Sequence, residues 1–168
     1  MKTNITLLLP LYIYQKKIAT TLAKKLNMML ADIKELLAFE LDVEKAVFIG
    51  GKEYLEKEET KLIERISSYS NTLIILDINT FLQEKNYNAL KKHSLITYFR
   101  FNESDIKKML KREKSESEVK LSEKLFNEWD KLLLKLCDVI VPCENMNKKE
   151  NIKQFLEEVN QHYLKKEN

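Results

Sequence analysis

Five short runs of apolar residues alternate along the chain with longer stretches in which apolar residues recur at helical spacing. The runs cover Ile5–Leu9, Met28–Ile33, Thr72–Ile78, Leu95–Phe101 and Cys137–Pro142. Each run is short and continuously apolar, which is typical of strands that are covered on both faces. The pattern therefore predicts a parallel β-sheet that lies between helices.

The intervening stretches predict helices. In the first, Gln15–Leu26, the apolar residues Ile18, Leu22 and Leu26 fall on one face while lysines occupy the other. Further helices are predicted over Leu55–Ile66, Leu82–Lys92, Ser104–Lys114, Leu121–Leu136 and Lys148–Lys166, with Asp42, Asn102 and Asn147 as N-caps. We expect an α/β protein with three α/β/α layers, a five-stranded parallel sheet and a single domain over residues 1–168.

Composition excludes some function classes without selecting one. Hydrophobic residues make up 44% of the 168 residues and charged residues 33%, as in ordered soluble proteins. The net charge of +3 is small, and no basic stripe with interleaved aromatic residues is present, so no nucleic-acid or membrane partner is expected. Cys137 and Cys143 are expected to be reduced thiols, and the apolar start is too short to span a bilayer. We expect a cytoplasmic protein.

The connection between the first apolar run and the first predicted helix lies where nucleotide-binding α/β proteins carry a phosphate-binding loop. That loop reads Gly-x-x-x-x-Gly-Lys-Ser/Thr, and its backbone N–H groups surround phosphate at the N-terminus of the following helix. Here the corresponding positions, Leu9 to Lys16, read LPLYIYQK. Both glycines, the lysine and the hydroxyl residue are replaced, and the whole chain contains only two glycines, Gly50 and Gly51.

Four segments carry a resemblance to a known family: ATTLAKKLNMMLADI (Ala19–Ile33), GKEYLEKEE (Gly51–Glu59), TLIILDINT (Thr72–Thr80) and CDVIV (Cys137–Val141). In order and spacing they resemble the shikimate kinase family of small P-loop kinases. The first resembles the family's first helix and second strand, and the last its final strand. The resemblance runs from Ile5 to about Tyr163. It implies a P-loop kinase topology and, as the family's activity, ATP-dependent phosphorylation of shikimate.

The resemblance places the family's nucleotide-binding positions on residues of different chemistry. The phosphate-binding lysine falls on Gln15 and the magnesium-binding hydroxyl on Lys16, so the cation is lost and the metal is repelled. Tyr14 stands where a glycine allows the backbone to approach phosphate. Lys16 and Lys17 either hold an anion at the helix N-terminus or are solvated. Tyr12 and Tyr14 either stack on a ligand or fill the volume of the nucleotide.

The family's Asp-x-Asp after the second strand becomes Asp32-Ile33-Lys34. Under the resemblance, Asp32 keeps the carboxylate that supports the metal; alternatively it only caps the next helix. Lys34 replaces the aspartate that binds a substrate hydroxyl in the family.

The remaining substrate positions are altered as well. The arginine that binds the substrate carboxylate falls on Glu56, and a second such arginine falls near Trp129. The family's Gly-Gly-Gly falls on Asp77-Ile78-Asn79, where Asp77 is either a metal-binding acid or a strand-end cap. The lid's Arg-Pro pair has no counterpart between Lys111 and Glu128, although Arg100 and Arg112 are candidates for residual phosphate binding.

These substitutions lead to two hypotheses. The first is a shikimate-kinase-like protein that has lost phosphoryl transfer and serves as a non-catalytic scaffold for an unknown protein partner or small molecule, with no cofactor. The second is an active small-molecule phosphotransferase that uses Mg-ATP in a rebuilt site, with Lys16 or Lys17 on phosphate and Asp32 with Asp77 on magnesium. Phosphoryl transfer depends on positioning and charge stabilisation, so losing several of these groups together favours the first hypothesis.

Overall fold

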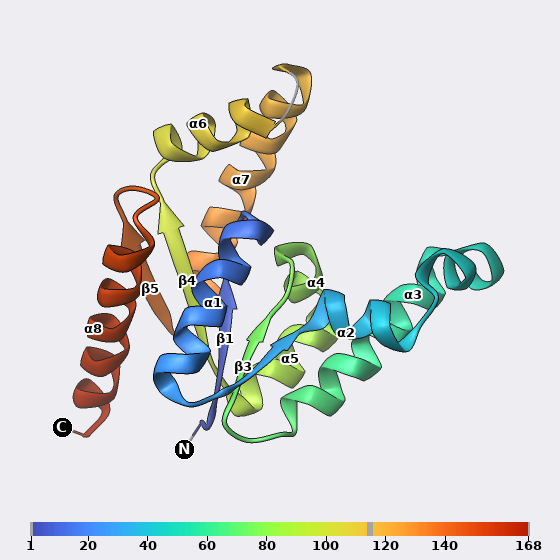
Figure 1. Ribbon diagram of the computed structural model, residues 1–168, viewed down its shortest axis with the longest axis horizontal. Coiled ribbons are helices and arrows are strands. Elements are labelled where there is room, and N and C mark those ends of the chain that lie inside the picture. Colours follow the sequence, from blue (N-terminus) through green and yellow to red (C-terminus); the bar gives the residue numbers. More distant parts are fainter. Residues whose placement is uncertain (1, 114–115, 168) are drawn as a thin grey trace. The chain divides into compact units, whose positions relative to one another are not determined.

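The structure is a computed structural model that describes residues 2–113 and 116–167 (Figure 1). The chain divides into two compact units, Met1–Ile96 and Thr97–Asn168. The boundary between them falls inside the fourth strand of the sheet, β4 (Ser94–Phe101), which therefore contributes residues to both units. The single domain expected over residues 1–168 stays a prediction.

The predicted five-stranded parallel sheet is confirmed. Its other strands are β1 (Asn4–Leu8), β2 (Met29–Asp32), β3 (Thr72–Ile75) and β5 (Val139–Cys143), and the strand order is β2-β3-β1-β4-β5. In the first unit, β3 lies between β1 and β2, and its residue Leu73 lies opposite Ile5 of β1 and Leu30 of β2. All residues of β1 and β3 are buried, as their continuous apolar sequences predict.

Helices flank the sheet and connect its strands. They are α1 (Tyr12–Leu26), α2 (Ile33–Glu40), α3 (Val43–Ser67), α4 (Ile78–Leu82), α5 (Glu84–His93), α6 (Glu103–Glu113), α7 (Glu116–Leu136) and α8 (Lys148–Glu167). The predicted caps are confirmed at Asp42, Asn102 and Asn147, whose side-chain oxygens accept backbone N–H groups of Lys45, Asp105 and Glu150. In the described part of the chain, no helix is long and apolar enough to cross a membrane.

Several predicted boundaries were wrong. Helix α1 begins at Tyr12 and not at Gln15, and β3 ends at Ile75 and not at Ile78. The helix expected over Leu82–Lys92 begins at Glu84, because the backbone of Gln83 is extended, and the short helix α4 that precedes it was not predicted. Helix α2 was not predicted, since it follows β2 without any intervening loop.

The two units have separate packing centres. In the first, α1 lies against the strands β1, β2 and β3, and its residues Ile18 and Leu22 are fully buried (Figure 1). In the second, Phe99 of β4 stacks on Phe155 of α8 with ring centroids 5.5 Å apart. The packing of α1 onto the first unit fixes its N-terminal turn next to the C-terminal ends of β1 and β3, the edge at which parallel sheets bind ligands.

Candidate functional site

The connection between β1 and α1 is short. Only Leu9, Pro10 and Leu11 separate the end of β1 at Leu8 from the start of α1 at Tyr12. Leu9 is 2% exposed, and Pro10 has no N–H group to offer to an anion. Tyr12 to Lys16, on which the resemblance places the second half of a phosphate-binding loop, are therefore already helical. The chain passes from strand to helix through a turn of three residues.

Gln15, on which the resemblance places the phosphate-binding lysine, is part of the protein interior. Its side chain is 1% exposed and its Nε2 donates hydrogen bonds to the carbonyl oxygens of Leu7 at 2.8 Å and Leu76 at 3.0 Å. Leu7 belongs to β1 and Leu76 directly follows β3. The amide thus joins two neighbouring strand ends to the first helix, and it satisfies two buried carbonyl groups that would otherwise lose hydrogen bonds to water.

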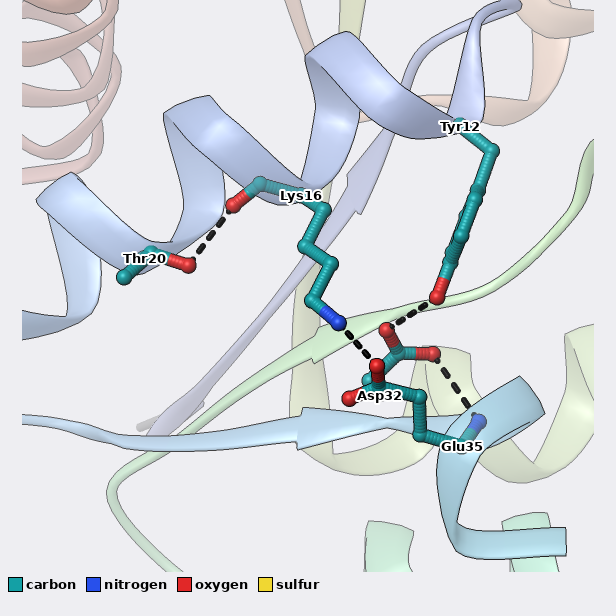
Figure 2. Close-up of polar contacts among 5 residues, drawn as sticks. All are labelled: Tyr12, Lys16, Thr20, Asp32 and Glu35. Atoms are coloured by element: carbon teal, nitrogen blue, oxygen red, sulfur yellow. Dashed lines mark hydrogen bonds and ion pairs between the residues drawn. The ribbon is translucent and has the colours of Figure 1, made fainter. Parts of the chain in front are cut away.

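Tyr12, the first residue of α1, forms a hydrogen bond with Asp32, the acid that the resemblance assigns to the metal. Figure 2 shows Tyr12 extending from α1 toward Asp32 at the end of β2, where its hydroxyl donates to Oδ2 at 2.6 Å. Oδ1 of Asp32 accepts the backbone N–H of Glu35 at 3.3 Å, so Asp32 is the N-cap of α2. Burial, and then the bond to Asp32, raise the pKa of Tyr12 above its ordinary value. Lys34 lies with its Nζ 4.7 Å from the centroid of the Tyr12 ring.

Lys16 and Lys17, the two lysines at the start of α1, have different surroundings. Lys16 forms an ion pair with Glu35, shown in Figure 2, and this contact raises the pKa of the lysine. Lys17 is exposed. Tyr14 is buried, with 9% of its surface exposed, so it is a core residue of the first unit. Of these residues, Lys16 lies near Asp32, but its ammonium group is paired with the carboxylate of Glu35.

A second group of polar residues lies between α3 and the start of α4. Asp77 caps α4 by accepting the N–H of Asn79 at 3.0 Å, and both residues are exposed. Glu59, half-buried on α3, accepts the hydroxyl of Thr80 at 3.2 Å. Burial raises the pKa of Glu59, and the negative charges of Asp77 and Glu56 raise it further, against the opposing effect of the Thr80 hydrogen bond. The positions that bind a substrate anion in the resemblance therefore form an acidic neighbourhood.

Glu56 itself forms an ion pair with Lys52, one helical turn earlier, at 3.5 Å. The lysine is largely exposed, so this pair contributes little to stability. In the part of the chain that the structure describes, no group of three or more metal-ligating side chains is placed to hold a metal ion.

In the second unit, Trp129 is half-buried on α7. The neighbouring residue Asp130 binds the guanidinium of Arg100 through both oxygens, at 2.9 and 2.8 Å, and also accepts the hydroxyl of buried Tyr98 at 3.0 Å. Arg100, Asp130 and Cys143 are among the residues around a cavity of about 460 Å³ at the ends of β4 and β5. Arg100, a candidate for residual phosphate binding, is thus already paired with a carboxylate.

Two other expectations concern the lid. Helix α6 ends at Glu113 and α7 begins at Glu116, while residues 114–115 and the side chain of Arg112 lie outside the described part of the structure. The role considered for Arg112, and the absence of an Arg-Pro pair in this segment, stay predictions from the sequence.

Comparison with known proteins identifies the family. The family model described as "Shikimate kinase" matches residues 16–160. The chain belongs to the shikimate kinase family. A shikimate kinase from Caldicellulosiruptor saccharolyticus is 28% identical over 130 residues, which cover 74% of this chain and 71% of the relative.

Solved structures of shikimate kinases have the same fold. The shikimate kinase from Acinetobacter baumannii, in complex with shikimate, has a TM-score of 0.76 at 14% identity, and the match covers 96% of this chain and 94% of that one. The shikimate kinase from Aquifex aeolicus has a TM-score of 0.75 at 21% identity, with 96% and 98% covered. The match to the family confirms the resemblance, and the shared fold confirms the P-loop kinase topology of the sheet.

Sequence reasoning missed several of the contacts described above. The hydrogen bonds of Gln15 to Leu7 and Leu76 connect residues far apart in the chain, and no local signal announces them. The same holds for the pair of Arg100 and Asp130. Glu59 could have been found, because it lies three residues after Glu56 and so shares its face of the helix.

Proposed function

We propose that this member of the shikimate kinase family does not transfer phosphate and serves as a non-catalytic protein that binds a partner or a small molecule. The observation that carries the proposal is the placement of Gln15. The side chain at the phosphate-lysine position is neutral, fully buried and hydrogen-bonded to two strand-end carbonyls. A transferred phosphoryl group needs a cation at this position, because its transition state is stabilised almost wholly by charge and positioning.

The contacts of Asp32 support the same proposal. Both of its oxygens already accept hydrogen bonds, from the Tyr12 hydroxyl and from the Glu35 N–H group. A magnesium ion at Asp32 would compete for Oδ2 with the Tyr12 hydroxyl, which lies 2.6 Å from that oxygen. Magnesium also loses its bound waters reluctantly, so an acid that is engaged in this way is a poor ligand.

The charge of the substrate region supports it as well. In the family the substrate carboxylate is bound by an arginine, and the resemblance places this arginine on Glu56. Glu56 and Asp77 both lie close enough to Glu59 for their negative charges to act on it. A carboxylate ligand would meet negative charge where it needs positive charge, and such a like-charge contact disfavours binding.

The alternative is an active phosphotransferase with a rebuilt nucleotide site. It requires Lys16 or Lys17 to bind phosphate and Asp32 with Asp77 to bind magnesium. Lys16 is paired with Glu35, and both aspartates cap helices. These contacts favour the non-catalytic proposal. Because the chain belongs to a kinase family, the experiment below tests the active phosphotransferase directly against the non-catalytic proposal.

The experiment is calorimetry on the full chain, first with Mg-ATP and then with shikimate, followed by a coupled assay for ADP production. An active shikimate kinase measured in parallel serves as the positive control. We expect no saturable heat with either ligand and no ADP above the rate without protein. Saturable Mg-ATP binding together with shikimate-dependent ADP production refutes the proposal.

A double substitution separates the loop from the rest of the site. Tyr14→Gly with Gln15→Lys restores two loop residues but leaves Lys34 and Glu56 unchanged. We expect this variant to remain inactive even under conditions in which circular dichroism shows that it is folded, because the substrate region still has the wrong charge. Activity in the double variant, with circular dichroism showing that it is folded, would mean that the loop alone accounts for the loss.

A further inference from the structure

A groove of about 490 Å³ lies between the C-terminal end of α3 and one face of α5. The two helices pack against each other within the first unit (Figure 1). Lys85, Asn88 and Lys92 of α5 line one wall of the groove. Glu64 and Ser67, the last helical residue of α3, are among the residues that line the other wall. The groove is therefore built from charged and polar groups of two helices.

This groove is separate from the region around Gln15 and Asp32. Helix α3 leads into β3 and α5 leads directly into β4, so both helices end near the edge at which these parallel strands begin. Asp32 is the last residue of β2 and lies at the opposite edge, where the strands end. None of the residues that line the groove is one on which the resemblance places nucleotide or substrate binding. A ligand in the groove would therefore occupy a different site.

Groups of opposite charge face the groove without forming ion pairs. Lys85 and Lys92 are exposed, and neither forms an ion pair with any carboxylate of the residues that the structure describes. Glu64, on the opposite wall, is exposed as well and forms no ion pair within the same part of the chain. All three charges are therefore available to another molecule.

The wall formed by α3 offers acceptors. The hydroxyl of Ser67 donates to the carbonyl oxygen of Glu64 at 2.9 Å, and the hydroxyl of Ser68 donates to that of Arg65 at 2.7 Å. Each hydroxyl oxygen keeps its capacity to accept a hydrogen bond. Together with the carboxylate of Glu64, this wall needs N–H donors, whereas the lysines of the other wall need anions. A peptide with acidic side chains supplies both, because its backbone carries the N–H groups.

A simple polyanion or a nucleic-acid strand fits the groove less well, because its phosphates would face the carboxylate of Glu64. The two lysines are seven residues apart on α5, which corresponds to about 10 Å along the helix axis. In a peptide with the polyproline II conformation, side chains three residues apart lie on the same side and are separated by about 9 Å. We propose that the groove binds an acidic segment of a partner protein in this extended conformation, with carboxylates on Lys85 and Lys92 and backbone N–H groups on Glu64.

The test is fluorescence anisotropy with the full chain at concentrations up to about 1 mM, because association follows mass action. The probe is a dye-labelled peptide of nine residues with glutamate at every third position and alanine or glycine elsewhere. We expect saturable binding in about 20 mM salt, where exposed charge pairs are weakly screened. The same peptide with glutamine in place of each glutamate should bind about tenfold more weakly, because it cannot form the two ion pairs.

Lys85→Gln and, separately, Lys92→Gln should each weaken binding about three- to fivefold, as expected for one exposed ion pair. Glu64→Leu should also weaken it about threefold, because the peptide N–H groups lose their acceptor, although the substitution removes a negative charge. Lys25→Gln is the matched control, since Lys25 is an exposed lysine of α1 that does not line the groove, and its loss should leave the affinity unchanged. All four residues are exposed, so the variants should remain folded by circular dichroism.

The absence of saturable binding at the highest concentration overturns the proposal. So does a Glu64→Leu variant that binds the peptide more tightly, because general attraction of an acidic peptide to a basic surface gives that result. Equal weakening by Lys25→Gln and Lys92→Gln, or tighter binding of a dye-labelled oligothymidylate than of the peptide, overturns it as well. The measurement involves neither Mg-ATP nor shikimate, and the inference does not rest on the proposed loss of catalysis.

Discussion

The buried amide of Gln15 gives a direct test of the reasoning about the β1–α1 connection. Gln15→Ala removes two hydrogen bonds, to the carbonyl oxygens of Leu7 and Leu76, and leaves both carbonyls without this donor in a site that is 1% exposed. Each buried group that loses its partner costs about 1–3 kcal/mol. The higher helix propensity of alanine returns at most a few tenths of a kcal/mol. We expect a net loss of about 2–6 kcal/mol in the free energy of unfolding.

The assay is urea unfolding followed by far-ultraviolet circular dichroism. Gln154→Ala is the control, because the Nε2 of Gln154 bonds the neighbouring Glu158 at 3.0 Å on α8 and its loss should cost less than about 0.5 kcal/mol. Gln15→Ala should lower the urea midpoint while leaving the slope of the transition unchanged. If Gln15→Ala and Gln154→Ala lower the midpoint equally, then Gln15 does not tie the strand ends together, and the main support for the proposed function is lost.

Three further predictions concern single residues. The folded-state pKa of Glu59 is raised, so its contribution to stability is present below the ordinary glutamate pKa of about 4.3 and is lost as pH rises through the folded value. Glu59→Gln should therefore stabilise the chain at pH 7 and make no difference near pH 3. Thermal unfolding at the two pH values measures this difference. Burial raises the pKa of the Cys143 thiol to about 12, so a thiol reagent at pH 8 should label Cys137 first, and Cys143→Ser should leave the rate of the fast phase unchanged. Gly51→Ala should cost about 1–3 kcal/mol in urea unfolding because of its backbone conformation alone, since a Cβ atom there meets no other atom within 4 Å; an unchanged midpoint would mean that the kink of α3 at Gly51 is not required.

The sheet was predictable from the sequence because its strands are covered on both faces. Residues such as Leu7 and Ile74 are fully buried, and this produces the uninterrupted apolar runs from which the five strands were identified. The N-caps Asp42, Asn102 and Asn147 were also recognised from the sequence. In both cases the physical cause is local in the chain.

The start of α1 was not predictable in the same way. Its N-cap residue is Leu11, which has no side-chain oxygen to accept a backbone N–H group, so the usual sequence signal is missing. Helix α2 was missed because Asp32 ends a strand and caps a helix at one residue. The bonds of Gln15 and of Tyr12 depend on how α1 packs on the strands, and that is fixed only by the tertiary structure.

The position of Gln15 has a consequence for how such a protein can change over evolutionary time. A single Gln15→Lys substitution would place an ammonium group inside a fully buried site whose partners are two carbonyl oxygens. Burying a charge in this way is costly without a paired carboxylate. The helix would also have to start later, so that a loop could form between Leu8 and residue 15. A single substitution toward a phosphate-binding loop therefore gives a less stable protein. This loss of stability disfavours a return of the β1–α1 connection to the sequence of a phosphate-binding loop.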